Sequence, residues 1–195
     1  ISINNMGTTL YQKGLIKESL HCFEQAHKID ADMGNHYGEA LAANNIALCY
    51  KAMGQHDKAE TFIENALAIK INLEDKYGKA RCYSNLGDIE RMRGRYKEAR
   101  HFYDKAMSIF NDSHDTHSLA MIQSNLGHIE FQQHNTREAS EFYRKALRLD
   151  QFSSDRRGLG FSYFNLARTY LVNGDYDLAE VYFNRVLNIG QGVGD

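Results

Sequence analysis

A 40-residue repeat constrains this sequence more than any other feature. The segments "YSNLGDIE" at 83–90 and "QSNLGHIE" at 123–130 are nearly identical, and their asparagines lie 40 residues apart. Each asparagine is followed by an apolar residue and then by Gly or Ala. The spacing holds along the whole chain without insertion or deletion, at Asn5, Asn45, Asn85, Asn125 and Asn165. A fixed period of this length predicts an array of similar supersecondary units.

The second half of each unit carries a repeated helical pattern. Small residues recur at Ser19, Ala59, Ala99, Ala139 and Ala179, and large apolar or aromatic residues follow four positions later. Offsets of three and four residues place side chains on one face of an α-helix. We therefore expect one buried stripe per unit. Its further columns are Ala26, Ala66, Ala106, Ala146 and Val186, and Ile29, Ile69, Ile109, Leu149 and Ile189.

Two kinds of residue are expected to break each unit into a pair of helices. Gly recurs nine residues after the asparagine, at Gly14, Gly54, Gly94 and Gly174, and Gly tolerates positive φ. The fourth unit has His134 there, and we expect the turn to be kept, because the neighbouring Asn135 can also tolerate a left-handed conformation. Asx residues that can cap the next helix stand at Asn35, Asp75, Asp115, Asp155 and Asp195.

Composition agrees with a helical, globular chain. Proline is absent and sustained period-2 alternation is missing, so long helices are favoured over strands. The net charge of −2 gives no reason to expect nucleic acid or an anionic membrane as a partner. No apolar run is long enough to span a bilayer, and no signal peptide is visible. Three cysteines without motif spacing indicate free thiols in a reducing, cytoplasmic setting.

The repeated pattern resembles the tetratricopeptide repeat (TPR). The resemblance rests on Asn-Leu-Gly in a first helix, Gly at the turn, and Ala, Tyr and Ala in a second helix. The 40-residue unit with "DKYGKA" before the first helix is similar to Pins/LGN-type and bacterial regulatory TPR arrays. The resemblance implies an all-α fold, a TPR-type α-solenoid of about five antiparallel helical hairpins forming a right-handed superhelix. We expect a single array over 1–195, excised from a longer protein, with units at approximately 1–35, 36–75, 76–115, 116–155 and 156–195.

The asparagines fall on a helix flank away from the apolar cluster of the first helix. The resemblance implies that this flank lines a concave groove, where asparagine amides hold the backbone of an extended peptide, as in an asparagine ladder. The alternative is structural, since an asparagine can also bridge neighbouring repeats or be solvated. The residues beside each asparagine on this flank vary from repeat to repeat, and they would supply specificity for the side chains of the peptide. The expected peptide-binding residues are Asn5, Asn45, Asn85, Asn125, Asn165, Arg81, Asp88, Arg91, His128 and Arg168.

Other residues near this flank refine the expected partner. Lys51 and the three arginines outnumber Asp88, which slightly favours an acidic peptide, although ordinary solvated charges explain them equally well. Tyr11, Phe131 and Phe161 are the aromatic candidates for ligand contacts. The carboxylate clamp of chaperone-binding TPRs requires Lys and Asn at set places in successive first helices. This pattern is not matched, because the positions three residues after each asparagine carry Thr8, Leu48, Asp88, His128 and Arg168.

No pattern indicates catalysis or a cofactor. His114 and His117 flank Asp115, but no second cluster accompanies them, so we expect no metal. The favoured function is a protein–protein interaction module that acts as an adaptor or scaffold, without enzymatic activity. The alternative is a regulatory input or dimerisation domain of a bacterial signalling protein, such as a transcription regulator or cyclase. The last helix, about 177–189, is expected to leave apolar surface uncovered and to promote self-association through the C-terminal repeat.

Overall fold

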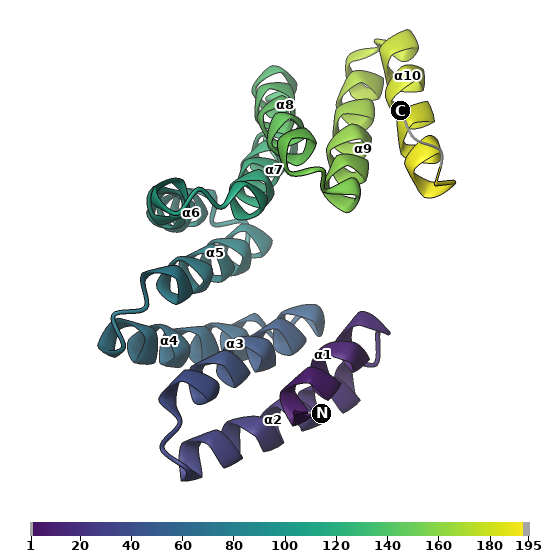
Figure 1. The fold of residues 1–195 in the computed structure, drawn as a ribbon. Coiled ribbons are helices and arrows are strands. Elements are labelled where there is room, and N and C mark those ends of the chain that lie inside the picture. The colour runs from purple at the N-terminus through teal and green to yellow at the C-terminus, as the bar shows by residue number, and fades with distance from the viewer. Residues whose placement is uncertain (1, 193–195) are drawn as a thin grey trace. The chain divides into compact units, whose positions relative to one another are not determined.

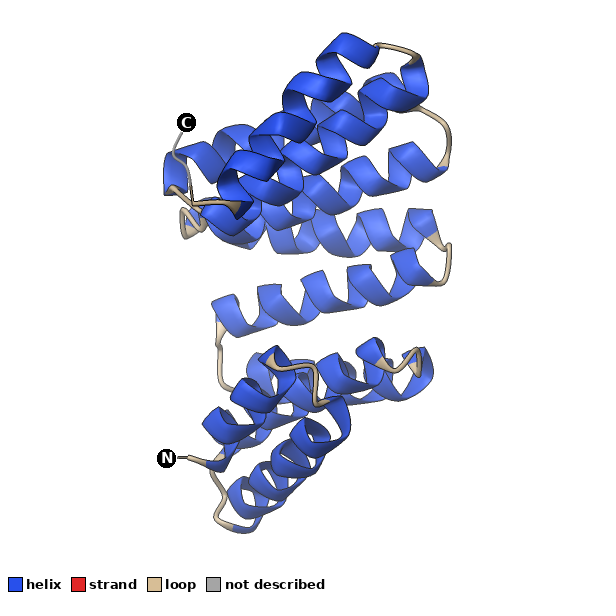
Figure 2. Cartoon of the chain, turned by 90° about the vertical axis from the view of Figure 1, so that its right-hand side faces the viewer, coloured by secondary structure: helices blue, strands red, loops and turns tan. Residues whose placement is uncertain are grey.

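The computed structural model describes residues 2–192, and within them the structure has ten α-helices joined by short turns (Figures 1 and 2). The expected all-α hairpin array is confirmed, with each unit of the repeat contributing one helical pair. The helices are α1 (Ile3–Gln12), α2 (Ile16–Asp32), α3 (His36–Ala52), α4 (His56–Asn72), α5 (Lys76–Met92), α6 (Tyr96–Asp112), α7 (Thr116–Gln132), α8 (Thr136–Ser153), α9 (Arg156–Asn173) and α10 (Tyr176–Gly190).

The chain forms two compact units, the first ending at Ile109 and the second beginning at Phe110. In the first unit, α1 packs on α2, α2 on α3, α3 on α4 and α4 on α5. In the second unit, α7 packs on α8, α8 on α9 and α9 on α10. Among the helix pairs named here, neighbours in sequence within a unit are therefore neighbours in space, as expected where each repeat buries its apolar face against the next.

The repeat columns of the second helices form the cores. The small column at Ser19, Ala59, Ala99, Ala139 and Ala179 is buried, with at most 2% of each residue exposed. The large residues four positions later are also buried in α2, α4, α6 and α8, from Phe23 to Tyr143. The last expected column is wrong at one position, because Ile29 is 45% exposed near the end of α2.

Glycine in the first helix allows close packing against an aromatic ring in the second. A Cβ atom built on Gly87 would lie 2.6 Å from Cε1 of Tyr103, and one on Gly127 would lie 2.7 Å from Cε1 of Tyr143. Where the first helix instead carries Ala47, the same core cluster contains the smaller Ile63. In the first four pairs glycine thus faces an aromatic ring and alanine faces the smaller isoleucine, whereas the fifth pair combines Ala167 with Phe183.

The turns follow the glycine column, with one correction. Gly14, Gly54, Gly94 and Gly174 all have φ between 73° and 83°. In the fourth unit His134 itself takes the left-handed conformation, with φ of 63°, whereas Asn135 has φ of −86° and precedes α8. The turn is therefore kept in the fourth unit, but the tolerance of Asn135 is not used, because the left-handed residue stays in the same position of the repeat.

A second left-handed position closes the second helix of each of the first four pairs and was not expected from the sequence. It carries Gly34, Glu74, His114 and Ser154, with φ between 54° and 67°. The next residue is the expected cap. Asp75 Oδ1 accepts from the Gly78 amide at 2.7 Å, and Asp115 Oδ1 accepts from the Ser118 amide at 3.0 Å. Asn35 and Asp155 cap their helices in the same way, and Asp195 lies outside the described residues.

The helix α10 exposes several apolar side chains. Leu178, Val181 and Leu187 are 45%, 50% and 58% exposed, respectively. The helix packs on α9 through Ala179, which is buried, and Phe183, which is partly buried. The last helix therefore leaves several apolar side chains accessible.

Candidate functional site

Most of the expected binding residues lie on one flank of the first helix of each pair, whereas Arg91 of α5 lies about 120° away from Asn85 around the helix and hydrogen-bonds Tyr103. We call this flank the asparagine face. In the first unit it comprises Leu41, Asn45 and Leu48 on α3 and Arg81, Asn85 and Asp88 on α5; in the second unit it comprises Met121, Asn125 and His128 on α7 and Phe161, Asn165 and Arg168 on α9. Asn5 of α1 is exposed, and the other four repeated asparagines are half-buried.

Two of the repeated asparagines bridge adjacent helical pairs. Asn45 Nδ2 donates to Asn4 Oδ1 at 3.0 Å, and Asn85 Nδ2 donates to Asn44 Oδ1 at 2.8 Å. This is the structural role that the sequence left open. It does not exhaust these side chains, because an amide nitrogen carries two N–H groups and each bridge uses one of them. The bridges also fix the orientation in which the rest of the amide is presented.

A charged cluster follows the asparagines along α5. Lys51 Nζ lies 2.8 Å from Asp88 Oδ2 and 3.5 Å from Asn85 Oδ1. Tyr103 donates its hydroxyl to Asp88 Oδ1 at 2.9 Å, and Arg91 also hydrogen-bonds Tyr103. Burial and the Asp88 carboxylate raise the pKa of Tyr103, so this hydroxyl remains a donor. Asp88 is therefore held by Lys51 and Tyr103 within the protein.

The asparagine face of the second unit is more aromatic. Arg168 lies over the Phe131 ring at 4.8 Å from the centroid and near the Phe164 ring at 5.7 Å. His128 is half-buried, with Nε2 3.4 Å from Gln132 Nε2. Phe161 is 63% exposed and fully available for contacts.

The third aromatic candidate lies in the first unit. Tyr11 is half-buried and packs against the core cluster of Phe23, Ile46 and Cys49. Its ring is therefore largely committed to the core, unlike that of Phe161.

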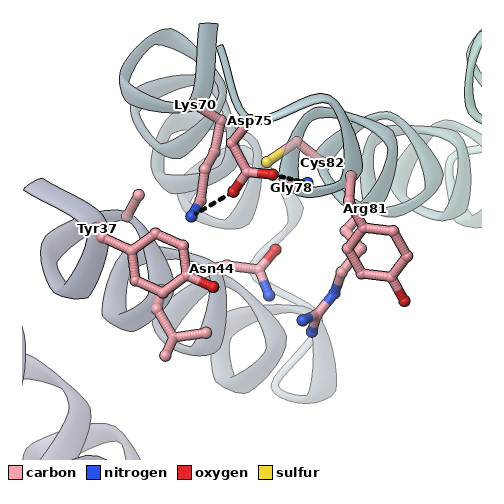
Figure 3. Close-up of a pocket in the computed structure, with 10 residues that line it drawn as sticks. Tyr37, Asn44, Lys70, Asp75, Gly78, Arg81 and Cys82 are labelled. Atoms are coloured by element: carbon pink, nitrogen blue, oxygen red, sulfur yellow. Dashed lines mark hydrogen bonds and ion pairs between the residues drawn. The ribbon is translucent and has the colours of Figure 1, made fainter. Parts of the chain in front are cut away.

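A small pocket of about 90 Å³ adjoins the asparagine face in the first unit (Figure 3). It is lined by residues of α3, α4 and α5 together with the cap of α5. Asn44 lies between Tyr37 and Arg81, with Lys70 and Asp75 on another side. The Asn44 side chain is buried, and its Nδ2 atom has no hydrogen-bond partner.

The charged groups of this pocket are unevenly satisfied. Lys70 Nζ pairs with Asp75 Oδ2 at 2.9 Å and lies 3.6 Å from the centroid of the Tyr37 ring. Burial opposes ionisation of Asp75, but the Gly78 amide and Lys70 outweigh it, so the pKa of Asp75 is lowered. Arg81 is exposed and also helps to lower the pKa of Asp75, so Lys70, Arg81 and the single Asp75 carboxylate leave the pocket with a net positive charge.

The thiol that lines the pocket is poorly suited to nucleophilic chemistry. Burial raises the pKa of Cys82 to about 11, so the unreactive thiol form dominates at neutral pH. Cys22 and Cys49 are likewise buried and free, as expected.

Sequence reasoning found Arg81 but missed the rest of this pocket. Asn44, Lys70 and Tyr37 occupy positions whose residue type changes from repeat to repeat, so the 40-residue pattern does not mark them. A signal was present in the doublets Asn4-Asn5 and Asn44-Asn45, where two amides stand side by side.

Neither a metal site nor a membrane span is found in the described part of the chain. Within residues 2–192 no three His, Cys, Asp or Glu side chains are grouped to hold a metal ion. His117 Nδ1 instead contacts Asp155 Oδ2 at 2.9 Å. Among the described helices, none is long and apolar enough to cross a bilayer.

Comparisons with known proteins agree with this geometry. Similar folds include BtubC (BKLC) from P. vanneervenii, with 20% identity, a TM-score of 0.77 and coverage of 97% of this chain and 79% of that one. The apo form of RapI has 18% identity and a TM-score of 0.78, and the match covers 97% of this chain and 69% of that one. A Rap protein complexed with competence and sporulation factor has 15% identity and a TM-score of 0.89, and the match covers 97% of this chain and 53% of that one.

Sequence comparison identifies the family. No protein of curated function matches this sequence. The family profile described as Tetratricopeptide repeat matches residues 1–72, 38–112 and 118–191. Domains of this family are generally protein–protein interaction modules and are typically non-catalytic. The chain belongs to the tetratricopeptide repeat family.

Proposed function

We propose that this chain is an interaction module that binds an extended peptide or partner segment along its asparagine face. One observation carries the proposal: this face combines oriented amides with large exposed apolar side chains. Met121 and Phe161 of this face are 50% and 63% exposed, and Met92, at the end of α5 on the same flank as Asn85, is 46% exposed. Exposed Met and aromatic residues next to polar groups are typical of protein-binding surfaces.

The amides would supply contacts that do not depend on the ligand's side chains. A peptide backbone offers alternating N–H and C=O groups, and a side-chain amide can pair with both. The bridges from Asn45 to Asn4 and from Asn85 to Asn44 support this role, because an amide already held in place loses less freedom on binding. Arg81, His128 and Arg168 would then select among side chains.

A second candidate is a regulatory input or dimerisation domain within a signalling protein. The fold similarity to the Rap protein complexed with competence and sporulation factor supports this candidate. The match covers 97% of this chain but 53% of that protein, so in that protein a similar array is part of a longer chain. In this candidate the same face would bind a regulatory factor, and the partner would be coupled to an attached domain rather than to a scaffold.

The test is a selection of random peptides with blocked termini on the intact chain, followed by affinity measurements. The double variant Asn85→Ala with Asn125→Ala should weaken the selected peptides about tenfold, because each amide contact contributes roughly 0.5–1.5 kcal/mol. The matched control is Asn65→Ala with Asn184→Ala, two exposed asparagines on α4 and α10. Helicity and the melting temperature are measured for both. Equal affinity in the two double variants would contradict the proposal.

A further inference from the structure

The pocket around Asn44 has an excess of unused hydrogen-bond donors. Asn44 is 5% exposed, and its Oδ1 atom already accepts from Asn85 at 2.8 Å. Its Nδ2 atom has no partner, although a buried donor without a partner costs about 1–3 kcal/mol. A ligand that accepts hydrogen bonds would remove this deficit.

The acceptors of the pocket, in contrast, are occupied. Asp75 accepts from the Gly78 amide at 2.7 Å through Oδ1 and pairs with Lys70 at 2.9 Å through Oδ2. The Lys70 and Asp75 charges therefore cancel, which leaves Arg81 as the net charge at the opening. Donors and one positive charge without free carboxylates indicate an anionic ligand.

The size and the lining residues of the pocket indicate which kind of anionic group it can bind. A volume of about 90 Å³ is sufficient for a carboxylate with a short aliphatic stem. Tyr37 and Tyr77, which are 61% and 46% exposed, flank the opening with aromatic surface suited to that stem. Arginine can bind a planar carboxylate with two parallel hydrogen bonds.

We propose that Asn44 and Arg81 form a carboxylate-binding pocket that takes an acidic group of the bound partner. The Asn44 amide donates to one carboxylate oxygen from the floor of the pocket, and the Arg81 guanidinium donates from its rim. This assignment rests on the proposed peptide-binding function and names one specificity-determining subsite for it. Since Leu41 and Arg81 belong to both the pocket and the asparagine face, a peptide on that face can insert a side chain without leaving it.

The probes are three capped amino acids that differ only in their carboxylates. N-acetyl-glutamate α-amide carries a side-chain carboxylate, N-acetyl-glutamine a terminal one, and N-acetyl-glutamine amide none. Each is titrated into the isotope-labelled intact chain, and NMR follows the Asn44 side-chain amide and the Gly78 backbone amide. We expect saturable shifts of both signals with a carboxylate probe, and the first two probes distinguish an internal acidic residue from a chain terminus. Equal shifts with the uncharged probe, or shifts with inorganic phosphate alone, would overturn the assignment.

Matched variants separate this subsite from peptide binding in general. Asn44→Asp keeps the acceptor for Asn85 but replaces the donor with a negative charge, and Arg81→Gln removes the charge at similar size. Both should weaken the carboxylate probe about tenfold or more, whereas the exposed Arg148→Gln on α8 should not. If selected peptides bind Asn44→Asp as well as the original chain, this inference fails while the proposed function stands. If no peptide is selected and the carboxylate probe still binds, the proposed peptide-binding function fails while the carboxylate pocket stands.

Discussion

Replacing Gly87 with alanine tests how closely the paired helices are packed. The new Cβ atom would lie 2.6 and 2.7 Å from two carbons of the Tyr103 ring, far inside the normal contact distance. Tyr103 is fully buried, and its hydroxyl is held at 2.9 Å by Asp88. The ring therefore cannot move away without losing that hydrogen bond, and the backbones of α5 and α6 have to separate instead.

Two opposing effects set the magnitude. Overpacking in a well-packed core costs about 1–3 kcal/mol. Alanine in a helix interior is favoured over glycine by roughly 1 kcal/mol. Because both the ring and its hydroxyl are fixed, we expect the packing cost to lie at the upper end, which gives a net destabilisation of about 1–2 kcal/mol.

Urea unfolding followed by circular dichroism measures this change. Gly160→Ala is the control, because its Cβ atom would meet only Ile189 Cγ2 at 3.9 Å, an ordinary contact, so that variant should be slightly more stable than the original. Gly87→Ala combined with Tyr103→Ile reproduces the Ala47 and Ile63 pair of the second repeat. The double variant should recover stability relative to the sum of the single changes. If Gly87→Ala stabilises the chain as Gly160→Ala does, the close-packing argument is refuted.

Three further predictions concern single positions. His134→Gly should raise the unfolding midpoint by relieving a left-handed conformation that costs about 1–2 kcal/mol, whereas His134→Ala should not. Burial raises the pKa of Asp150 despite its 2.7 Å hydrogen bond from Ser162. Between the ordinary pKa of an aspartate and this raised pKa, the folded state binds more protons than the unfolded state, so stability should fall as pH rises through that window. Asp150→Asn should remove this fall and be more stable at neutral pH in urea titrations across pH. The exposed apolar side chains of α10 should promote self-association, and Val181→Glu with Leu187→Glu should shift sedimentation at high concentration toward the monomer. A monomeric original chain would contradict this last prediction.

Features that depend on local chemistry could be predicted from the sequence. The caps at Asp75 and Asp115 and the turn at Gly54 follow from what these residue types do within a few positions of themselves. The buried columns also follow, because helical spacing and the 40-residue period both mark them. Where a single repeat departed from the pattern, at His134, the backbone kept the repeat's conformation rather than that of the neighbouring asparagine.

Features that join different repeats could not be predicted in the same way. The bridge from Asn85 to Asn44 depends on the residue preceding each repeated asparagine, and this column reads Asn4, Asn44, Ser84, Ser124 and Phe164. A varying column is indistinguishable from solvated surface until the packing is known. The pocket has the same origin, because Lys70 approaches Asn44 and Arg81 from a different helix.

The two amide bridges of the first unit have a consequence for how such a chain can change in length. Both join residues 41 positions apart, one full repeat plus one residue. If the 40 residues from Asn45 to Ser84 were deleted, Asn85 would follow Asn44 directly and inherit the position of Asn45 opposite Asn4. The donor and acceptor at the new junction would be the same pair of groups. Recombination between repeats can therefore add or remove one repeat while the same amide–amide hydrogen bond forms at the new junction. The repeated asparagines thus join any two such repeats in the same way.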